Sequence, residues 1–445
     1  MEINTAIVAG TGKSGISATK LLVNHGVKVY LFDENKDRDI EAIKEKTGDS
    51  ELGEDALSSS QLMVISPGIP VDAPFTDVVR NAGIPIWSEI ELAYHYGKGK
   101  IAAITGTNGK TTTTALVGEI VKAHNAKTIV VGNIGIPYTE LCDTTDDDSD
   151  TVAEISSFQL ETVIDFHPNV SAILNLTPDH LNRHYTFENY GNVKFSITKN
   201  QTMDDVTVLN YDDEHTRAMG EKAKDHCHVV YFSRLEKPVG GVYVEDGDII
   251  LEDGDKKINV LAIKDLKLMG AHNVENVLAA VGISYYMGVP VDVIRDVATS
   301  FKAVAHRIEY VDTVDGVAYY NDSKGTNPDA AIKGIQAMVA PTFLIGGGYD
   351  KGSEYDEWIE AFDGKVKWLV LIGQTAQKIA DCAKRHGFNS IIFEENLQDA
   401  VAYCHENAVD GDAVLLSPAC ASWGQFDNYE QRGDMFKEYV RSYKE

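Results

Sequence analysis

Cysteine is scarce in this chain of 445 residues, and the few thiols are widely scattered. The five are Cys142, Cys227, Cys382, Cys404 and Cys420. An odd number at these spacings fits neither a disulfide framework nor a zinc knuckle. Because reduced thiols are the rule in the cytoplasm, we expect a cytoplasmic protein.

Basic charge and long apolar runs are also in short supply. Lysine and arginine together number 40 against 68 acidic residues, which gives a formal net charge of -28. This balance disfavours non-specific binding to nucleic acid or to an anionic membrane surface. No apolar run reaches the roughly 18 residues that span a bilayer, and Ile3–Ala9 is too short for a signal peptide. We therefore expect no nucleic-acid partner and no membrane span.

A glycine-rich turn in the middle of the chain has the features of a phosphate-binding loop. The apolar run Ile101–Ile104 predicts a strand, and Thr112–His124 has apolar residues at helical spacing. Between them lies Gly106-Thr-Asn-Gly-Lys-Thr, two residues shorter than the usual nucleotide loop. Glycines and a helix N-terminus can cradle oxyanions, Lys110 can reach terminal phosphates, and the Thr111 hydroxyl can bind Mg²⁺.

The N-terminus carries a second glycine loop. Gly10-x-Gly12-x-x-Gly15 follows a predicted strand at Thr5–Ala9, with Asp33 about 20 residues further on, as in dinucleotide-binding folds. Another strand, Gln61–Ser66, ends in a turn at Pro67–Pro70. This unit has fewer than about a hundred residues, the size of a mononucleotide-binding half, which favours a nucleoside diphosphate over NAD.

The rest of the chain alternates predicted strands and helices, so we expect an α/β fold with mainly parallel sheets. Its length exceeds one core and predicts two to three domains, and the succession of strands and helices divides the chain into three units. They are a Rossmann-like domain at 1–96, a P-loop ATPase-like domain at 97–304 and a Rossmann-like domain at 305–445. Strand-like segments from Gly241 to Leu261 predict edge hairpins. The joins near Gly97 and His306 predict hinges.

Polar residues at other strand ends could complete a site. Glu154 and His180 should lie on the same rim as Lys110, where a carboxylate suits Mg²⁺ and an imidazole is a less usual ligand. In the third domain, Asn321–Pro328 places an acid and a lysine at a strand end, and Ser417–Trp423 is a strand-end turn rich in hydroxyl groups.

At this level of detail the chain resembles a known family. Gly106–Thr113 resembles the ATP loop of the Mur ligases and of their relative folylpolyglutamate synthetase, and Gly270–Asn276 resembles their adenine-contacting segment. Ala305–Arg307 resembles their link into the C-terminal domain. Glu154–Glu161 and Ser417–Gly433 are similar to the members that add D-glutamate. The resemblance covers essentially the whole chain.

The resemblance implies a UDP-binding domain, an ATPase domain and a mobile C-terminal domain. It implies that ATP phosphorylates the carboxylate of UDP-N-acetylmuramoyl-L-alanine, and that the amine of D-glutamate displaces phosphate to form an amide. This is a cytoplasmic step of peptidoglycan precursor synthesis, and we expect a monomer. The implied cofactors are ATP and two Mg²⁺ ions.

The resemblance also implies roles for individual residues. Thr111 and Glu154 would serve one Mg²⁺ and His180 the other, while Lys194 would carry a CO₂-derived carbamate that binds metal. The catalytic residues would be Lys110, His180, Lys194 and Lys324. ATP would be bound by Gly106, Thr107, Asn108, Gly109, Lys110, Thr111, Thr112, Asn273, Asn276, Arg307 and Asp322. The other substrates would be bound by Lys13, Ser14, Gly15, Pro67, Gly68, Asn133, Ser156, Ser157, Thr326, Lys351, Ser422, Trp423 and Tyr429.

Several alternatives stay open at this stage. Glu34-Asn35 lacks the arginine that some relatives place against uracil, so base recognition is undecided. A nucleotide-switched binding protein would need a base-reading motif, which we do not find. An NAD-dependent oxidoreductase rests on the first glycine loop alone. Within the family, the runner-up is a ligase that adds L-alanine or a diamino acid, although the arginine-containing motif of the diamino-acid enzymes has no clear counterpart.

Overall fold

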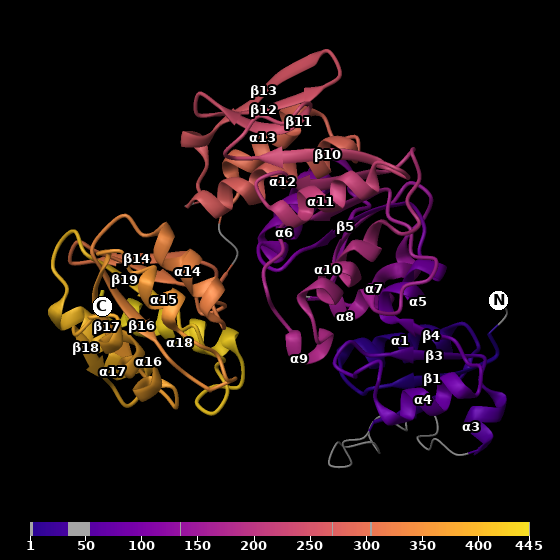
Figure 1. The fold of residues 1–445 in the computed structure, drawn as a ribbon, viewed down its shortest axis with the longest axis horizontal. Coiled ribbons are helices and arrows are strands. Elements are labelled where there is room, and N and C mark those ends of the chain that lie inside the picture. The colour runs from indigo at the N-terminus through magenta and orange to yellow at the C-terminus, as the bar shows by residue number, and fades with distance from the viewer. Residues whose placement is uncertain (1–2, 34–53, 134, 269, 303–304, 445) are drawn as a thin grey trace. The chain divides into compact units, whose positions relative to one another are not determined.

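A computed structural model describes residues 3–33, 54–133, 135–268, 270–302 and 305–444. Its strands form three sheets, of four, nine and six strands (Figure 1). The chain divides into two compact units, Met1–Asp265 with Glu275–Ser300, and Leu266–Val274 with Phe301–Glu445. The predicted α/β class with mostly parallel sheets is confirmed, and the domain boundaries stay a prediction.

The N-terminal sheet is parallel throughout, in the order β2-β1-β3-β4. Its strands are β1 (Thr5–Ala9), β2 (Lys28–Phe32), β3 (Leu62–Ile65) and β4 (Ile86–Ser88). Its helices are α1 (Lys13–Asn24), α3 (Glu54–Ser59), α4 (Pro74–Asn81) and α5 (Glu89–Tyr96). Glu34-Asn35, the segment considered for uracil recognition, lies outside the described residues.

The central sheet has the order β13-β12-β11-β10-β9-β8-β5-β7-β6. The predicted hairpins at one edge are confirmed, because β11, β12 and β13 pair antiparallel while the other pairs are parallel. The strands are β5 (Lys100–Thr105), β6 (Ile129–Gly132), β7 (Asp150–Glu154), β8 (Val170–Ile173), β9 (Val206–Asn210), β10 (His228–Ser233), β11 (Gly241–Glu245), β12 (Asp248–Asp253) and β13 (Lys256–Ala262). The helices are α6 (Lys110–His124), α7 (Tyr138–Leu141), α8 (Ser157–Leu160), α9 (Leu181–His184), α10 (Phe187–Phe195), α11 (Glu214–Ala223), α12 (Ala271–Tyr286) and α13 (Val291–Ser300).

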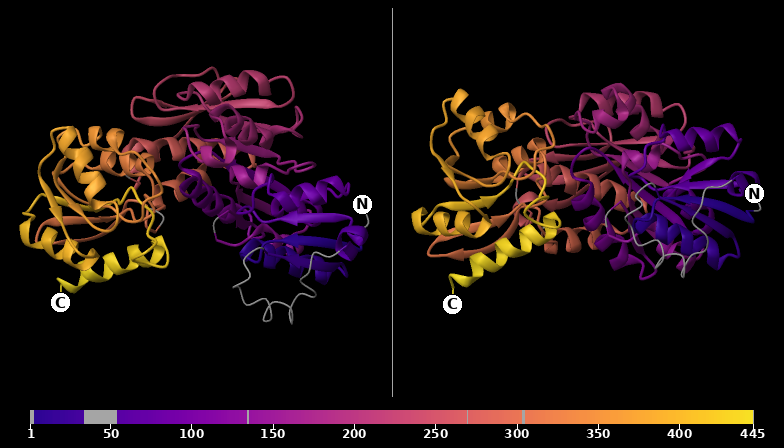
Figure 2. Two further views of the ribbon diagram at one scale, coloured as in Figure 1. Left: turned by 60° about the horizontal axis from the view of Figure 1, so that its bottom comes forward. Right: turned by 90° about the horizontal axis from the view of Figure 1, so that it is seen from below.

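The C-terminal sheet has the order β14-β15-β19-β16-β17-β18, in which only the β14–β15 pair is antiparallel among the described strands. The strands are β14 (Glu309–Val314), β15 (Val317–Asn321), β16 (Thr342–Gly346), β17 (Val366–Leu371), β18 (Ile391–Phe393) and β19 (Ala413–Leu416). The helices are α14 (Pro328–Ala337), α15 (Asp356–Glu360), α16 (Ala376–Arg385), α17 (Leu397–Asn407) and α18 (Tyr429–Ser442). Figure 2 shows α18 as the long yellow helix that leads to the C-terminus.

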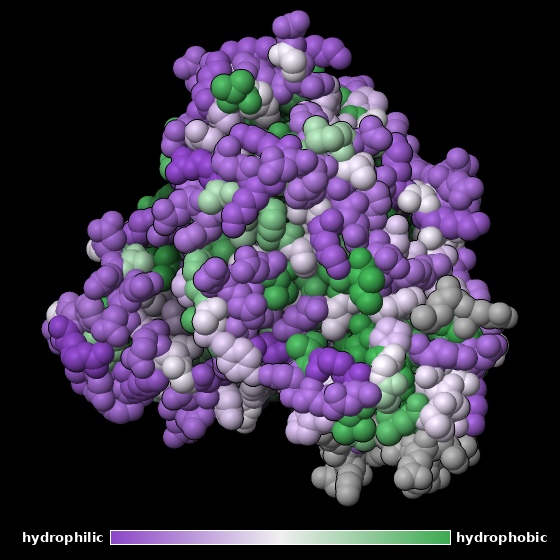
Figure 3. All heavy atoms as spheres, turned by 45° about the vertical axis from the view of Figure 1, so that its right-hand side comes forward, coloured by the Kyte–Doolittle hydropathy of each residue, from purple (hydrophilic) through white to green (hydrophobic). Residues whose placement is uncertain are grey.

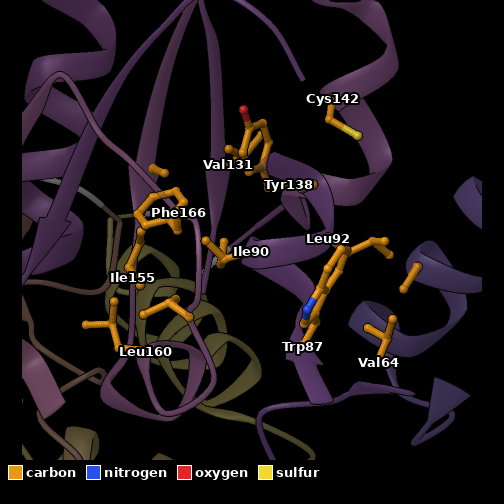
Figure 4. Close-up of a cluster of buried hydrophobic side chains, with 14 of the residues drawn as sticks. Val64, Trp87, Ile90, Leu92, Val131, Tyr138, Cys142, Ile155, Leu160 and Phe166 are labelled. Atoms are coloured by element: carbon orange, nitrogen blue, oxygen red, sulfur yellow. The ribbon is translucent and has the colours of Figure 1, made fainter. Parts of the chain in front are cut away.

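The N-terminal and central sheets share one hydrophobic cluster, part of which is drawn in Figure 4. Trp87 and Ile90 come from β4 and α5, while Val131 and Phe166 come from the central part of the chain, and all four are at most 8% exposed. Because the two sheets are joined by a common core, the structure does not support the predicted hinge near Gly97.

The start of α5 has an N-cap but no reciprocal capping box. The Ser88 hydroxyl accepts a hydrogen bond from the backbone N–H of Glu91, as expected for an N-cap. The Glu91 carboxylate is used elsewhere: it accepts hydrogen bonds from three successive backbone N–H groups at Ile164–Phe166. A carboxylate from the N-terminal sheet region thus binds a loop of the central region.

The surface is largely hydrophilic. On the face drawn in Figure 3, hydrophilic side chains cover most of the surface and hydrophobic ones form small groups. Within the described ranges, no helix combines the length and the apolar character that crossing a bilayer requires.

Candidate active site

A cleft of about 460 Å³ lies at the carboxyl ends of β1 and β3. Asp33 accepts hydrogen bonds from the N–H and the hydroxyl of Thr11, so it orients the glycine loop. Gly15 does not line the cleft: a Cβ there would stand 1.8 Å from the Gly10 oxygen, so this glycine lets α1 pack against the turn. Four of the predicted substrate-binding residues line the cleft, namely Lys13, Ser14, Pro67 and Gly68.

The predicted phosphate loop joins the centre of the nine-stranded sheet to α6. Gly106 and Gly109 have φ of 147° and 82°, conformations that favour glycine. A Cβ on Gly109 would approach the Asn276 Oδ1 atom to 2.2 Å. The Lys110 ammonium donates to the carbonyl oxygens of Gly106 and Thr107, both at 2.8 Å. The loop is therefore folded around its lysine, with the N-terminus of α6 behind it.

The segment after β8 holds this loop in place. The Asn108 N–H donates to the Asn175 side chain at 2.8 Å, and the Asn175 amide donates back to the Asn108 oxygen at 3.1 Å. The Thr107 hydroxyl accepts from the Thr177 N–H at 3.1 Å. These contacts hold the chain that follows β8 against the loop, and they assign Asn175 a role that the sequence did not reveal.

Lys194, on α10, is fully buried beside the same loop. It is 2% exposed, and its ammonium donates to the Gly106 oxygen at 2.8 Å and to the Thr105 hydroxyl at 3.3 Å. Burial, reinforced by the positive charge of Lys110, holds the pKa of Lys194 well below its usual range, and the nearby carboxylates of Asp179 and Glu154 oppose this. The structure thus brings two lysines and two carboxylates to one strand-end rim.

The other predicted residues of this rim follow neighbouring strands. Glu154 ends β7, is 2% exposed, and accepts from the Asn133 side-chain amide at 3.0 Å. Asn133 is itself exposed, just after β6. His180 follows β8, is about half exposed, and lies beside the Phe158 ring with centroids 4.8 Å apart. Asp179 is a further acid at this rim, to which the sequence had not drawn attention. Its carboxylate accepts a hydrogen bond from the backbone N–H of His180.

Both serines after β7 already have hydrogen-bond partners. Ser156 is the N-cap of α8 and forms a reciprocal capping box with Gln159. Ser157 lies 3.0 Å from Nε2 of the buried His184. Burial, with help from the charges of His180 and neighbouring cations, lowers the pKa of His184 to about 4, so its ring is neutral at pH 7.

Helix α12 supplies the predicted adenine-side residues. Asn276 accepts from the Thr113 hydroxyl of α6 at 3.3 Å, which places it directly behind the phosphate loop. Asn273 lies one helical turn earlier, and each asparagine is 6% exposed.

In the C-terminal unit, three adjacent strands end at one rim. The loops after β16 and β19 are joined by backbone hydrogen bonds from Gly347 to Pro418 and from Tyr349 to Ala421, both 2.9 Å. The third loop follows β15. These loops carry the predicted residues Asp322, Lys324, Thr326, Lys351, Ser422 and Trp423, while Tyr429 begins α18.

Asp322 is buried at the centre of this rim. It accepts from the Ser417 hydroxyl at 2.7 Å and from the Ile308 N–H at 3.3 Å. Burial raises its pKa to about 7, although these hydrogen bonds and the charge of Arg307 oppose the shift.

Arg432, on α18, ties two of the loops together. It is 1% exposed and donates to the Ser323 hydroxyl and carbonyl at 2.9 and 2.6 Å, and to the Cys420 carbonyl at 3.2 Å. Burial lowers the pKa of this guanidinium to about 10. Arg432 lies within the Ser417–Gly433 motif, and that position is the only feature of the sequence that could have pointed to its role.

The predicted amino-acid-binding residues lie on the same loops and at the start of α18. The Lys324 ammonium lies over the Tyr429 ring, 5.2 Å from its centroid. Trp423 is 56% exposed and contacts Tyr349 edge to face. Lys351 is exposed, and Ser422 is buried. The arrangement offers cations, hydroxyl groups and an aromatic surface to a small anionic ligand.

Comparison with known proteins agrees with this reading. Residues 4–88 match the Mur ligase MurD-like N-terminal domain, residues 104–284 the Mur ligase middle domain, and residues 306–420 the Mur ligase glutamate ligase domain. The chain is also similar over its length to the UDP-N-acetylmuramate-alanine ligase structure from Thermotoga maritima. That match has a TM-score of 0.62 at 19% identity and covers 99% of this chain and 100% of the other, which shows a shared fold.

Curated relatives are far more similar in sequence. The UDP-N-acetylmuramoylalanine–D-glutamate ligase of Lachnospira eligens is 55% identical, with 99% of each chain covered. The protein of the same name from Lachnoclostridium phytofermentans is 51% identical, with 99% of this chain and 98% of the relative covered. Identity at this level over whole chains, on top of three matching domains, means that the protein belongs to the Mur ligase family.

Proposed function

We propose that the protein is an ATP-dependent ligase that adds D-glutamate to UDP-N-acetylmuramoyl-L-alanine through an acyl phosphate, in cytoplasmic peptidoglycan precursor synthesis. The observation that carries the proposal is the rim on which the phosphate loop, Glu154 and buried Lys194 converge, in a chain 55% identical to a relative of that name. The proposal includes three domains, 1–96, 97–304 and 305–445, and a monomeric enzyme.

In this function Lys110 exchanges its two carbonyl partners for the terminal phosphates of ATP. Its present bonds to Gly106 and Thr107 show that the ammonium reaches across the loop. The backbone N–H groups at the start of α6 face the same oxyanions. Asn276, held against α6, keeps the loop in shape from behind.

The donor set suits Mg²⁺, a hard ion that prefers oxygen ligands. Thr111 and Glu154 would hold one ion, and His180 with carbamylated Lys194 the other. Magnesium bound there would neutralise charge on the phosphate oxygens as phosphate moves between two anions. The Lys194 carbamate would form when the neutral amine attacks CO₂, making an N–C bond and releasing one proton. Its burial away from water favours the neutral amine that this step requires.

The remaining residues would bind the two substrates that are joined. The N-terminal cleft would take the UDP phosphates through the Lys13 ammonium and the backbone of the glycine loops. Asn133, Ser156 and Ser157 would lie near the muramoyl-alanine end, where Asn133 already orients Glu154. Arg307 and Asp322 would complete the ATP site. D-glutamate has two carboxylates, and the lysines and hydroxyls for it would be Lys324, Thr326, Lys351 and Ser422, beside Trp423 and Tyr429.

The test is phosphate release from ATP, with UDP-N-acetylmuramoyl-L-alanine present and a panel of amino acids offered in turn. We expect release with D-glutamate and none with L-alanine or a diamino acid. Lys110→Ala should lower kcat by about 10²–10³-fold because it removes a charge aimed at the transferring phosphate. Lys122→Ala, at the exposed far end of the same helix, is the control. Normal turnover by Lys110→Ala would refute the proposed function.

The carbamate has its own test. Assays in CO₂-depleted buffer should be slower, and added bicarbonate should restore the rate. Lys194→Arg keeps a cation but cannot be carbamylated, so its rate should not respond to bicarbonate. Unchanged activity of the unaltered enzyme without CO₂ would remove the carbamate while leaving the ligase reaction in place.

A further inference from the structure

Away from the proposed active site, α15 and α16 bring three possible metal ligands together. Cys382 lies in the last turn of α16, and His386, four residues later, is the C-cap residue directly after that helix, so the two side chains are on the same side of it. Asp356 begins α15 and packs against them: its Oδ1 atom is 2.8 Å from Nε2 of His386. One ligand atom from each of the three residues lies within 4.8 Å of the others.

The second nitrogen of the histidine has a partner of its own. Nδ1 of His386 lies 3.7 Å from the Glu360 carboxylate. A carboxylate that hydrogen-bonds the second nitrogen orients metal-binding histidines, and Glu360, whose side chain is 65% exposed, is free to move into that position. This contact is separate from the three-residue cluster, in which Nε2 faces Asp356.

The cluster is buried on one side and open on the other. Cys382 is 2% exposed, while the side chains of Asp356 and His386 are 44% and 24% exposed. An ion could therefore enter from solvent and keep a water as its fourth ligand. Arg385 pairs with Asp356 at 3.3 Å, but its side chain is 60% exposed and can move into solvent.

We propose that Asp356, Cys382 and His386 form a binding site for a transition-metal ion of the Zn²⁺ class. A thiolate, an imidazole and a carboxylate are the donors that Zn²⁺ prefers, whereas Mg²⁺ favours oxygen ligands and does not bind thiolates. The site therefore selects a different ion from the one that the ligase reaction uses, and it is built from elements that do not contribute to the phosphate-loop rim.

An ion here would tie the start of α15 to the C-terminal end of α16. Asp356 lies on the same chain segment after β16 as Lys351. The other end of α16 already contacts this segment, because the Thr375 hydroxyl accepts a hydrogen bond from the Gly348 N–H at 3.0 Å. The bound ion would thus hold the far end of the segment to which the proposed function assigns D-glutamate.

The test uses Co²⁺ as a coloured substitute for Zn²⁺, added to the full-length protein after removal of metals with a chelator. We expect a thiolate-to-cobalt charge-transfer band that saturates at one ion per chain and is abolished by added Zn²⁺. Co²⁺ at the Mg²⁺ positions would have no thiolate ligand and would not give this band. Absence of the band, or one that Zn²⁺ does not displace, would overturn the proposal.

Variants locate the site. Cys382→Ser and His386→Gln should lose the band, whereas Cys227→Ser, at another buried cysteine, should keep it. If Cys382→Ser does not fold, the partly exposed His386 and Asp356 still decide the matter, because a band retained in both His386→Gln and Asp356→Asn would refute the site. Glu360→Gln should weaken Co²⁺ binding about tenfold, as loss of an outer carboxylate does elsewhere. These readouts do not depend on ligase activity, so they can fail while the proposed function stands.

Discussion

The Glu91 carboxylate, which joins the N-terminal and central regions, gives the sharpest prediction about stability. Its side chain is completely buried. Its Oε2 atom accepts from the N–H groups of Ile164 and Phe166 at 2.9 and 3.0 Å, and Oε1 accepts from that of Asp165 at 2.7 Å. We consider Glu91→Gln, which keeps the size of the side chain and removes one acceptor atom, and Glu91→Ala, which removes both.

The magnitude follows from the number of hydrogen bonds lost. A hydrogen bond to a charged group contributes roughly 1.5–3 kcal/mol. Glutamine can keep its oxygen at the Oε2 position and serve two of the N–H groups, so it loses the bond from Asp165, about 2 kcal/mol. The 3.3 Å contact of Oε1 with Nε2 of His95 can persist with the glutamine amide as donor. Alanine leaves all three N–H groups without an acceptor. Because only the N–H group of Phe166 is fully buried, we expect a loss of stability of roughly 4 kcal/mol.

Amide hydrogen exchange measures this locally, without assuming that a protein with several sheets unfolds in one step. At about 1.4 kcal/mol per factor of ten, exchange at residues 164–166 should accelerate roughly 30-fold in Glu91→Gln and several hundredfold in Glu91→Ala. Glu119→Gln, on the exposed side of α6, should change nothing. Exchange in Glu91→Ala within threefold of the unaltered protein would refute the idea that this carboxylate holds the two regions together.

Two further predictions concern single residues of the proposed site. Gly109→Ala should raise the KM for ATP at least tenfold, because the new Cβ would stand 2.2 Å from Oδ1 of Asn276. The control is Gly26→Ala, since Gly26 has a similar φ of 77° but open space around it, and this variant should leave KM unchanged. Equal effects of the two variants on KM would show that backbone strain alone matters. Asp322 has a folded pKa raised from 3.8 to about 7, so its contribution to stability is complete below about pH 4 and is lost as the pH rises through 7. Relative to the unaltered protein, Asp322→Asn should therefore gain about 3 kcal/mol of stability between pH 5 and pH 8, and thermal unfolding curves with parallel pH dependence would contradict this.

The sequence predicted the strand-end loops well, for a physical reason. Apolar runs that end in glycine, such as Thr5–Ala9 before Gly10, are fixed by local requirements: a buried parallel strand and a turn with positive φ. The loop at Gly106 was found in the same way. Because parallel strands end on one side of a sheet, knowing the strands was enough to place Glu154 on the same rim as Lys110.

Features that depend on distant partners were missed. Asn175 is an ordinary strand-end residue until its amide pairs with the backbone of Asn108, 67 residues away. The edge strand β14 is only partly buried, so its apolar pattern is weak. Glu91 satisfied the local rule for a capping box, yet three N–H groups more than 70 residues away compete successfully for its carboxylate. In each case a tertiary contact overrides, or supplies, what the local sequence suggests.

The phosphate loop shows why the charge on Lys194 matters to the proposed reaction. The ammonium groups of Lys110 and Lys194 both donate to the carbonyl oxygen of Gly106 at 2.8 Å, so two positive charges share one acceptor. Burial and this repulsion both disfavour a proton on Lys194. A neutral amine would relieve the repulsion, and a carbamate would turn it into attraction between opposite charges. In a chain with a net charge of -28, an extra anion at this point would also supply the oxygen ligands that a divalent cation needs beside ATP.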